Sequence, residues 1–145
     1  KSVLGIDLDT LRIKRANLIK KILNIDNVNF VLEDLYKIPD SYDFDVTIAL
    51  GLLHRIPDMN MCLSKMCQIS NTVIVEFKAL RSEEDVYLNH GGVSKSNSNN
   101  KLYNTPSIQY IKNRFMELGH EDIITYEDKD SSLKYPRAIV VASKN

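Results

Sequence analysis

Short apolar runs alternate with amphipathic segments along most of this chain. Runs with a two-residue period are typical of strands, and apolar positions three or four apart are typical of helices. Their alternation predicts an α/β fold, with a mostly parallel sheet and helices on both faces. The expected strands cover 3–7, 28–33, 44–50 and 72–78, and the expected helices cover 10–24, 58–69 and 105–118.

The C-terminal end carries two further alternating segments, 122–127 and 137–143, which predict an antiparallel hairpin at the sheet edge. Residues 44–50 form a continuous apolar run, which indicates a strand buried on both faces. Helix 58–69, capped by Asp58, presents a stripe expected in the core. This stripe consists of Met59, Cys62, Leu63, Met66 and Ile69.

Helix 10–24 combines an apolar stripe with basic residues that lie mostly off it. The stripe consists of Leu11, Leu18, Ile19, Ile22 and Leu23. The basic residues favour a solvated helix face over a nucleic-acid site. Residues 81–102 lack a regular pattern and are expected to form a flexible loop or insert within a single domain, 1–145. Residues 94–100 are predicted to be its most mobile part.

Composition narrows the functional classes. Lys plus Arg and Asp plus Glu both number 19, so the chain has no basic excess of the kind that nucleic-acid binders show, although an RNA acceptor stays open. Cys62 and Cys67 lie five apart in a predicted helix, a spacing that predicts buried thiols in a reducing cytoplasm and no metal site. No apolar run approaches the length of a membrane span, so we expect no membrane partner.

Polar residues stand where the predicted strands end. Asp7 follows the first strand, Asp34 the second and Gly51 the third. In open α/β sheets, ligands bind at the carboxyl ends of the strands, and an acid there can accept hydrogen bonds from ribose hydroxyls. The alternatives are that Asp7 is a helix N-cap and that Asp34 is a turn acid or cap, with Glu33 as its substitute.

As a set, these segments resemble the Rossmann-like class of S-adenosylmethionine-dependent methyltransferases. The resemblance implies S-adenosylmethionine as the cofactor, with its ribose at Asp7 and its adenine along Leu8. It also implies that Asp34 and Leu35 bind the adenine edge. The backbone at Gly51 and Leu52 is then expected to pass close to the sulfonium.

The turn Leu53-His54-Arg55-Ile56-Pro57-Asp58 resembles the family segment in which paired histidines precede Pro-Asp. The resemblance implies that His54 and Arg55 face the substrate as the candidate catalytic residues. A neutral histidine can accept a proton, and an arginine can hold an anionic group. The alternative for His54 is a buried ring that is hydrogen-bonded to the backbone.

The C-terminal half is most similar to the bacterial wobble-uridine tRNA carboxymethyltransferases, through Leu102–Ser107 and Tyr135–Val141. This resemblance implies that Tyr103 and Arg137 bind substrate, and that Arg137 holds the carboxylate of carboxy-S-adenosylmethionine. Carboxymethyl transfer to tRNA is therefore one functional alternative. A surface charge on an edge strand is the other interpretation of Arg137.

Family members open with a strand and a Gly-rich turn, whereas this chain begins at what matches their second strand. We therefore expect an N-terminally truncated domain, with weak cofactor binding by residues 1–145 alone. The main functional hypothesis is one-carbon transfer to a small-molecule, nucleotide or tRNA acceptor. The alternative is an inactive or incomplete domain that serves as an interaction module, and an exposed sheet favours a homo-oligomer under either hypothesis.

Overall fold

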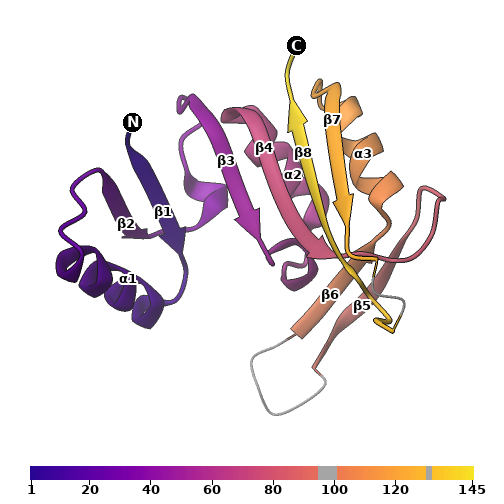
Figure 1. Ribbon diagram of the computed structural model, residues 1–145, viewed down its shortest axis with the longest axis horizontal. Coiled ribbons are helices and arrows are strands. Elements are labelled where there is room, and N and C mark those ends of the chain that lie inside the picture. The colour runs from indigo at the N-terminus through magenta and orange to yellow at the C-terminus, as the bar shows by residue number, and fades with distance from the viewer. Residues whose placement is uncertain (95–100, 130–131) are drawn as a thin grey trace. The chain divides into compact units, whose positions relative to one another are not determined.

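The computed structural model describes residues 1–94, 101–129 and 132–145. The chain divides into two compact units, unit 1 (Lys1–Asp40) and unit 2 (Ser41–Asn145), and each has its own elements (Figure 1). That the chain forms one domain stays a prediction.

Unit 1 is a strand–helix–strand unit. Strand β1 (Val3–Asp7) pairs in parallel with β2 (Val28–Leu32), and α1 (Thr10–Ile22) connects them. A single 3₁₀ turn, η1 (Leu35–Lys37), follows. The predicted elements are confirmed, but α1 ends before residue 24, because Asn24 adopts a left-handed conformation with φ of 50°.

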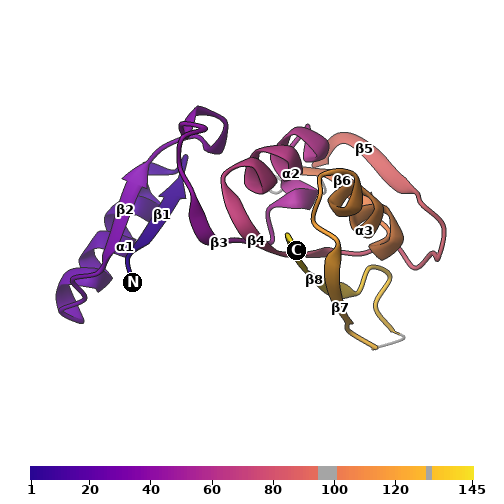
Figure 2. The same ribbon diagram turned by 90° about the horizontal axis from the view of Figure 1, so that it is seen from above.

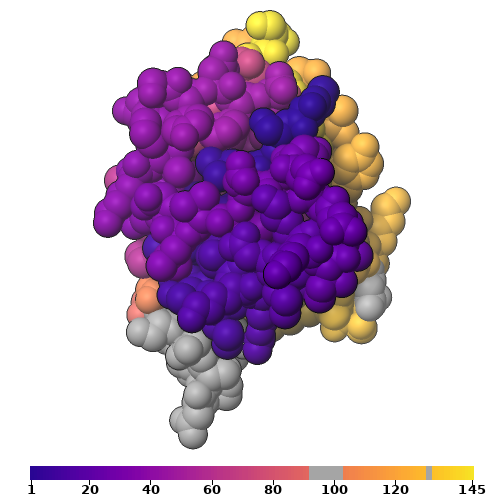
Figure 3. All heavy atoms as spheres, turned by 90° about the vertical axis from the view of Figure 1, so that its left-hand side faces the viewer, coloured from indigo at the N-terminus to yellow at the C-terminus, as the bar shows by residue number. Residues whose placement is uncertain are grey.

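The apolar stripe of α1 does not form a core within unit 1. No residue of α1 is buried. Figure 3 shows the surface of unit 1 in indigo and violet. All five stripe residues are more than half exposed: Leu11, Leu18, Ile19, Ile22 and Leu23. The physical reason is that a two-stranded sheet offers one helix little apolar area to cover.

Unit 2 contains a four-stranded sheet in the order β3-β4-β8-β7. The β3–β4 pair is parallel, whereas β4–β8 and β8–β7 are antiparallel, so the predicted C-terminal hairpin is confirmed. The sheet elements are β3 (Phe44–Leu50), β4 (Ser70–Lys78), β7 (Asp122–Glu127) and β8 (Arg137–Ser143). The remaining elements are η2 (Leu53–Arg55), α2 (Met59–Gln68), β5 (Tyr87–Ser94), β6 (Lys101–Pro106) and α3 (Ile108–Glu117).

The core of unit 2 lies between its sheet and two helices. Helices α2 and α3 lie on the same side of the sheet (Figure 2). The prediction that helices cover both faces of the sheet is therefore wrong within this unit. The predicted α2 stripe is confirmed, because all five of its residues are buried, and Asp58 caps α2 by accepting from Met61 N at 2.8 Å. The sheet contributes the fully buried Val73, Val75, Phe77 and Val140.

Strand β3 departs from the prediction of burial on both faces. Val46, Ile48 and Leu50 are 45%, 61% and 68% exposed, and within the strand only Ala49 is buried. The cause is position, because β3 is an edge strand of the four-stranded sheet and the helices of unit 2 cover only one face. The continuous apolar run therefore leaves an exposed apolar surface.

The prediction that residues 81–102 lack regular structure is wrong in part, because β5 and β6 form an antiparallel hairpin. His90 Nε2 lies 2.9 Å from Thr105 Oγ1, and the Tyr87 ring packs on Tyr110 of α3 with centroids 4.9 Å apart. Pairing across the hairpin thus stabilises two strands that no regular apolar pattern in the sequence indicates. Residues 95–100, for which high mobility is predicted, lie outside the described residues.

The two cysteines behave as the sequence predicts. Cys62 and Cys67 are buried and free, and burial raises the pKa of each thiol to about 12. Both side chains therefore pack as small apolar groups rather than as nucleophiles. Across the described ranges, no helix combines the length and apolarity needed to cross a bilayer.

Candidate functional site

The carboxyl ends of β1 and β2 bring the predicted acids of unit 1 to one edge of its sheet. Asp7 is the last residue of β1 and lies opposite Leu32 in the parallel register. Glu33 N donates to Asp7 O at 3.2 Å, and Asp34 follows directly. The structure thus brings together Asp7 and Asp34, which stand 27 positions apart in the sequence by their numbers.

The N-cap of α1 is Asp9 and not Asp7. The Asp9 carboxylate accepts hydrogen bonds from Leu11 N and Arg12 N. Asp7 instead accepts from Asp9 N through Oδ1 at 2.8 Å and pairs with Arg12 through Oδ2 at 3.3 Å. This ion pair is exposed, with Asp7 about one-third and Arg12 62% exposed. Leu8, beside it, is 72% exposed. A strand-end carboxylate beside an exposed apolar side chain suits the ribose and base of a nucleoside.

Asp34 acts as a cap in this structure. Its Oδ1 accepts from Tyr36 N at 3.0 Å and begins η1, whose first residue is Leu35. Glu33 supports the turn, because its Oε1 accepts from Asp34 N at 2.9 Å. The alternative that Asp34 is a cap is therefore confirmed, and this cap uses Oδ1. The binding of adenine by Asp34 and Leu35 stays a prediction.

In unit 2, the turn after β3 depends on a glycine. Gly51 has φ of +67°, which strains residues with a side chain, and its N donates to Glu76 O on β4 at 2.9 Å. Leu52 follows, half-buried, and leads into η2. The backbone therefore turns sharply at the carboxyl end of β3, where the resemblance places the sulfonium.

His54 is buried, and its electrostatic surroundings keep it neutral. The side chain is 4% exposed, and among the described residues its Nδ1 has no hydrogen-bond partner. Burial, followed by the charges of Arg137, Lys78 and Arg55, lowers the pKa of His54 to about 4. The expected backbone bond is therefore absent at Nδ1, although the expected burial is present. Arg55 itself is exposed.

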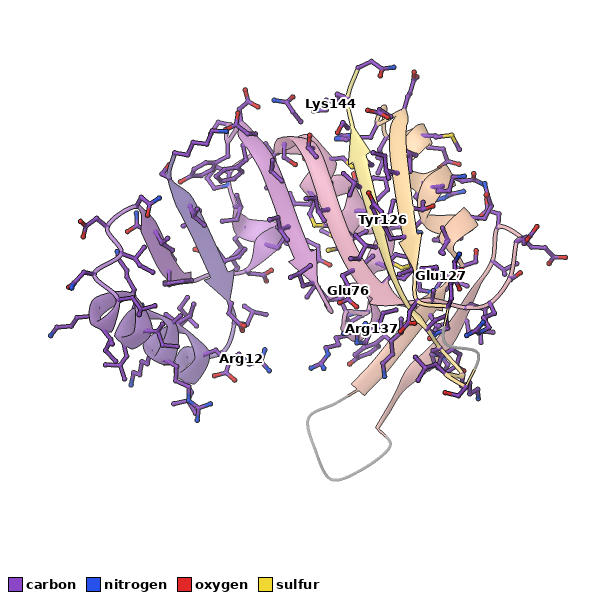
Figure 4. All side chains as sticks on the ribbon, viewed as in Figure 1. Arg12, Glu76, Tyr126, Glu127, Arg137 and Lys144 are labelled. Atoms are coloured by element: carbon purple, nitrogen blue, oxygen red, sulfur yellow. The ribbon has the colours of Figure 1, made fainter. Side chains whose placement is uncertain are left out.

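An ion pair that the sequence interpretation missed lies beside this turn. Arg137 Nε, at the start of β8, donates to Glu76 Oε1 at the carboxyl end of β4 at 2.5 Å, and Figure 4 labels both side chains. Glu76 is 15% exposed and Arg137 is 47% exposed. Arg137 is thus a paired residue rather than an isolated surface charge. Glu76 stands two residues before the end of the predicted strand 72–78, so only a rule that also took polar residues just inside a strand end would have found it.

The β5–β6 hairpin is joined to the same turn through a buried amide. Asn104 is 2% exposed, and its Nδ2 donates to Ile56 O at 2.8 Å. Tyr103, half-buried, precedes it on β6. Asn104 was not singled out from the sequence, since its partner is a backbone carbonyl 48 residues away. The role of Tyr103 toward a substrate stays a prediction.

Comparison with solved structures shows a shared fold. The N-terminal domain of EvdMO1, determined in the presence of SAH and D-fucose, matches with a TM-score of 0.80 at 14% identity, over 100% of this chain and 67% of that chain. Magnesium protoporphyrin IX methyltransferase (ChlM) from Synechocystis PCC 6803 with bound SAM matches with 0.72 at 17% identity, over 99% and 60%. The N-methyltransferase NodS from Bradyrhizobium japonicum WM9 in complex with S-adenosyl-l-homocysteine matches with 0.70 at 11% identity, over 99% and 66%.

These likenesses confirm the α/β fold of the Rossmann-like methyltransferases, and the chain spans about two thirds or less of the three solved chains. No curated protein matches. Residues 1–123 match the model of a methyltransferase domain family. The chain therefore belongs to this family of methyltransferase domains.

Proposed function

We propose that this chain binds S-adenosylmethionine and takes part in transfer of its methyl group to an acceptor. The observation that carries the proposal is the placement of Asp7 and Asp34 at the same edge of two parallel strands. That edge is where open α/β sheets bind nucleotide-like ligands. The family match over residues 1–123 supports the same activity.

The residues of unit 1 fit the nucleoside part of this cofactor. The Asp7–Arg12 pair is exposed, and such pairs contribute little, so ribose hydroxyls can replace Arg12 at Oδ2. Leu8 offers an exposed apolar surface to the base. When bound, the cofactor supplies a methyl group on a sulfonium that is already a good leaving group. The work of the protein is therefore chiefly to position the reactants.

The residues of unit 2 suit the acceptor side of the reaction. His54 stays neutral at pH 7, while Glu76 and Arg137 present opposite charges beside Gly51. Arg55 is exposed on the same turn and can meet an anionic part of the acceptor. We propose these residues for substrate binding and catalysis, in a reducing cytoplasm where the two free thiols persist.

Replacing Asp7 with alanine is expected to weaken adenosylhomocysteine binding by roughly 1–3 kcal/mol, or roughly 5- to 150-fold, because a charged hydrogen-bond acceptor is lost. Isothermal titration calorimetry of the protein measures this change directly. An affinity equal to that of the wild type would remove Asp7 from the cofactor site.

The matched control is Asp9→Ala, two residues away. It removes the N-cap of α1, which costs about 1 kcal/mol of helix stability, but it leaves the Asp7 carboxylate in place. Adenosylhomocysteine affinity should change much less than in Asp7→Ala. Equal losses in the two variants would show that both act through the start of α1 rather than through a contact with ribose.

Carboxymethyl transfer to tRNA is the more specific alternative from the sequence, and it depends on Arg137. Glu76 already binds Arg137 Nε, so part of the guanidinium fork that would hold the carboxylate of carboxy-S-adenosylmethionine is engaged. The chain also lacks the basic excess that favours RNA. For both reasons we propose methyl rather than carboxymethyl transfer.

An interaction module is the second candidate, favoured by the uncovered apolar face of the unit 2 sheet. Its exposed residues include Val46, Ile48, Leu50, Ile124, Tyr126 and Ile139. Apolar patches of this kind commonly mark interfaces, and we propose a second copy of the chain as the partner. Sedimentation equilibrium distinguishes the cases, since a monomer at every concentration tested would exclude self-association.

A further inference from the structure

Helix α1 has an apolar ridge on the side that faces away from its own sheet. On the inner side, Ala16 and Lys20 line a hollow together with Phe30 of β2. Successive helix residues are about 100° apart, so positions seven and four residues apart share the roughly opposite side. The side chains there are aliphatic and more than half exposed, and they form the α1 ridge: Leu11, Leu18 and Ile22. The two strands of unit 1 therefore cannot cover this ridge.

Basic side chains flank the α1 ridge. Lys14 and Lys21 lie along one side of it and Arg15 along the other, and all three are exposed. Among the described residues none of these three forms an ion pair, whereas Arg12 is paired at the start of the helix. Helix α1 contains no acidic residue. The ridge thus carries three uncompensated positive charges in a chain whose formal net charge is zero.

This combination of charge and shape disfavours several partners. A second copy of α1 would bring like charges together, which destabilises a helix pair. A nucleic acid would meet the cations through its phosphates but would gain nothing from the aliphatic ridge. A protein helix could meet both, but three aliphatic side chains form a contact much smaller than the about 1,200 Å² that stable protein interfaces bury.

We propose that α1 binds the surface of an anionic lipid bilayer. The α1 ridge enters the boundary of the acyl chains, and Lys14, Arg15 and Lys21 lie at the level of the phosphate headgroups. A bilayer takes up each apolar side chain and attracts each cation separately, so it requires no minimum area of contact. The expectation of no membrane partner rests on the lack of a spanning run, which a helix lying at the interface does not need. The inference is independent of methyl transfer.

The test is co-sedimentation of the whole protein with vesicles of phosphatidylcholine alone or mixed with phosphatidylglycerol. The protein should bind the anionic vesicles at low salt, should not bind the neutral ones, and should be released as salt screens the charges. The variant Lys14→Gln/Arg15→Gln/Lys21→Gln should bind the anionic vesicles roughly 150-fold more weakly. This loss corresponds to about 1 kcal/mol for each basic residue near an anionic surface.

The matched control removes three exposed lysines elsewhere and changes the net charge equally: Lys37→Gln/Lys129→Gln/Lys144→Gln. It should bind the anionic vesicles with nearly the affinity of the wild type. An equal loss in the two triple variants would mean that net charge alone attracts the protein to the vesicles, which overturns the inference.

The ridge itself is tested with Leu18→Gln, which should weaken vesicle binding by roughly tenfold because the apolar side chain no longer enters the lipid. Leu18 is 58% exposed, so the circular dichroism spectrum should stay unchanged. Met116→Gln, on the exposed side of α3, is its control and should bind as the wild type does. Unchanged binding in Leu18→Gln, no binding to anionic vesicles, or tighter binding to duplex DNA than to these vesicles overturns the inference.

Discussion

Replacing Phe77 with alanine is expected to lower the free energy of unfolding by about 3–5 kcal/mol, the usual cost of removing a buried aromatic ring. Phe77 is fully buried on β4, opposite Ala138 in the register, on the face that α2 and α3 cover. The substitution leaves a cavity beneath the strand that carries Glu76 and Lys78 on its other face. Urea denaturation of both proteins, followed by circular dichroism, measures the difference.

The control is Tyr126→Ala, which also removes an aromatic ring from the same sheet. Tyr126 is 60% exposed on β7. Its replacement should lower the free energy of unfolding by no more than about 1 kcal/mol, which is the full span of strand propensities. A loss at Phe77 no larger than the loss at Tyr126 would mean that the face under α2 and α3 is not the core of unit 2.

Acid is expected to destabilise the protein through His54 by roughly 3 kcal/mol between pH 6.5 and pH 4. The ordinary pKa of the ring is 6.5, and burial, with Arg137, Lys78 and Arg55, lowers it to about 4 in the folded protein. Between these values the unfolded chain binds a proton that the folded chain does not. Stability from the neutral ring is therefore fully present above pH 6.5 and is lost as pH falls toward 4.

His54→Gln isolates this contribution, because glutamine does not titrate. The free energy of unfolding, measured by urea denaturation across this pH range, should fall more steeply in the wild type than in the variant. Nuclear magnetic resonance of the His54 ring protons should give a midpoint near 4 in the folded protein. Parallel pH curves for the two proteins, or a midpoint near 6.5, would show that the ring is solvated.

Much of the candidate site followed from reading where the strands end. The positions of Asp7 and Gly51 at strand ends are confirmed, because an apolar run that stops at a polar residue or a glycine marks a strand terminus locally, while their roles toward the cofactor stay predictions. Arg137 was singled out by the resemblance to tRNA carboxymethyltransferases, and its role toward a substrate stays a prediction. Glu76 was missed because it stands within the predicted strand 72–78, and its partner lies 61 residues later by number. Only the antiparallel register of β4 and β8 brings the two charges together.

The β5–β6 hairpin was missed for a related reason. Its strands mix a few apolar residues with polar residues and glycines, so the sequence shows no regular apolar alternation to indicate a strand. The strands are stabilised by pairing with each other and by Asn104, which bonds to a carbonyl beyond η2. Such long-range contacts have no local signal in composition or spacing.

Local sequence determined the type, order and ends of most elements. A continuous apolar run specified β3, and apolar periodicity specified α2 and β8. The caps Asp58 and Ser107 began their helices where the side chain could accept a free backbone N–H. The tertiary structure alone decided which faces are buried, since Ile48 is as apolar as Val75 yet lies on the uncovered side. It also decided the ion pair and the burial of His54, because charge and desolvation depend on neighbours distant in the chain.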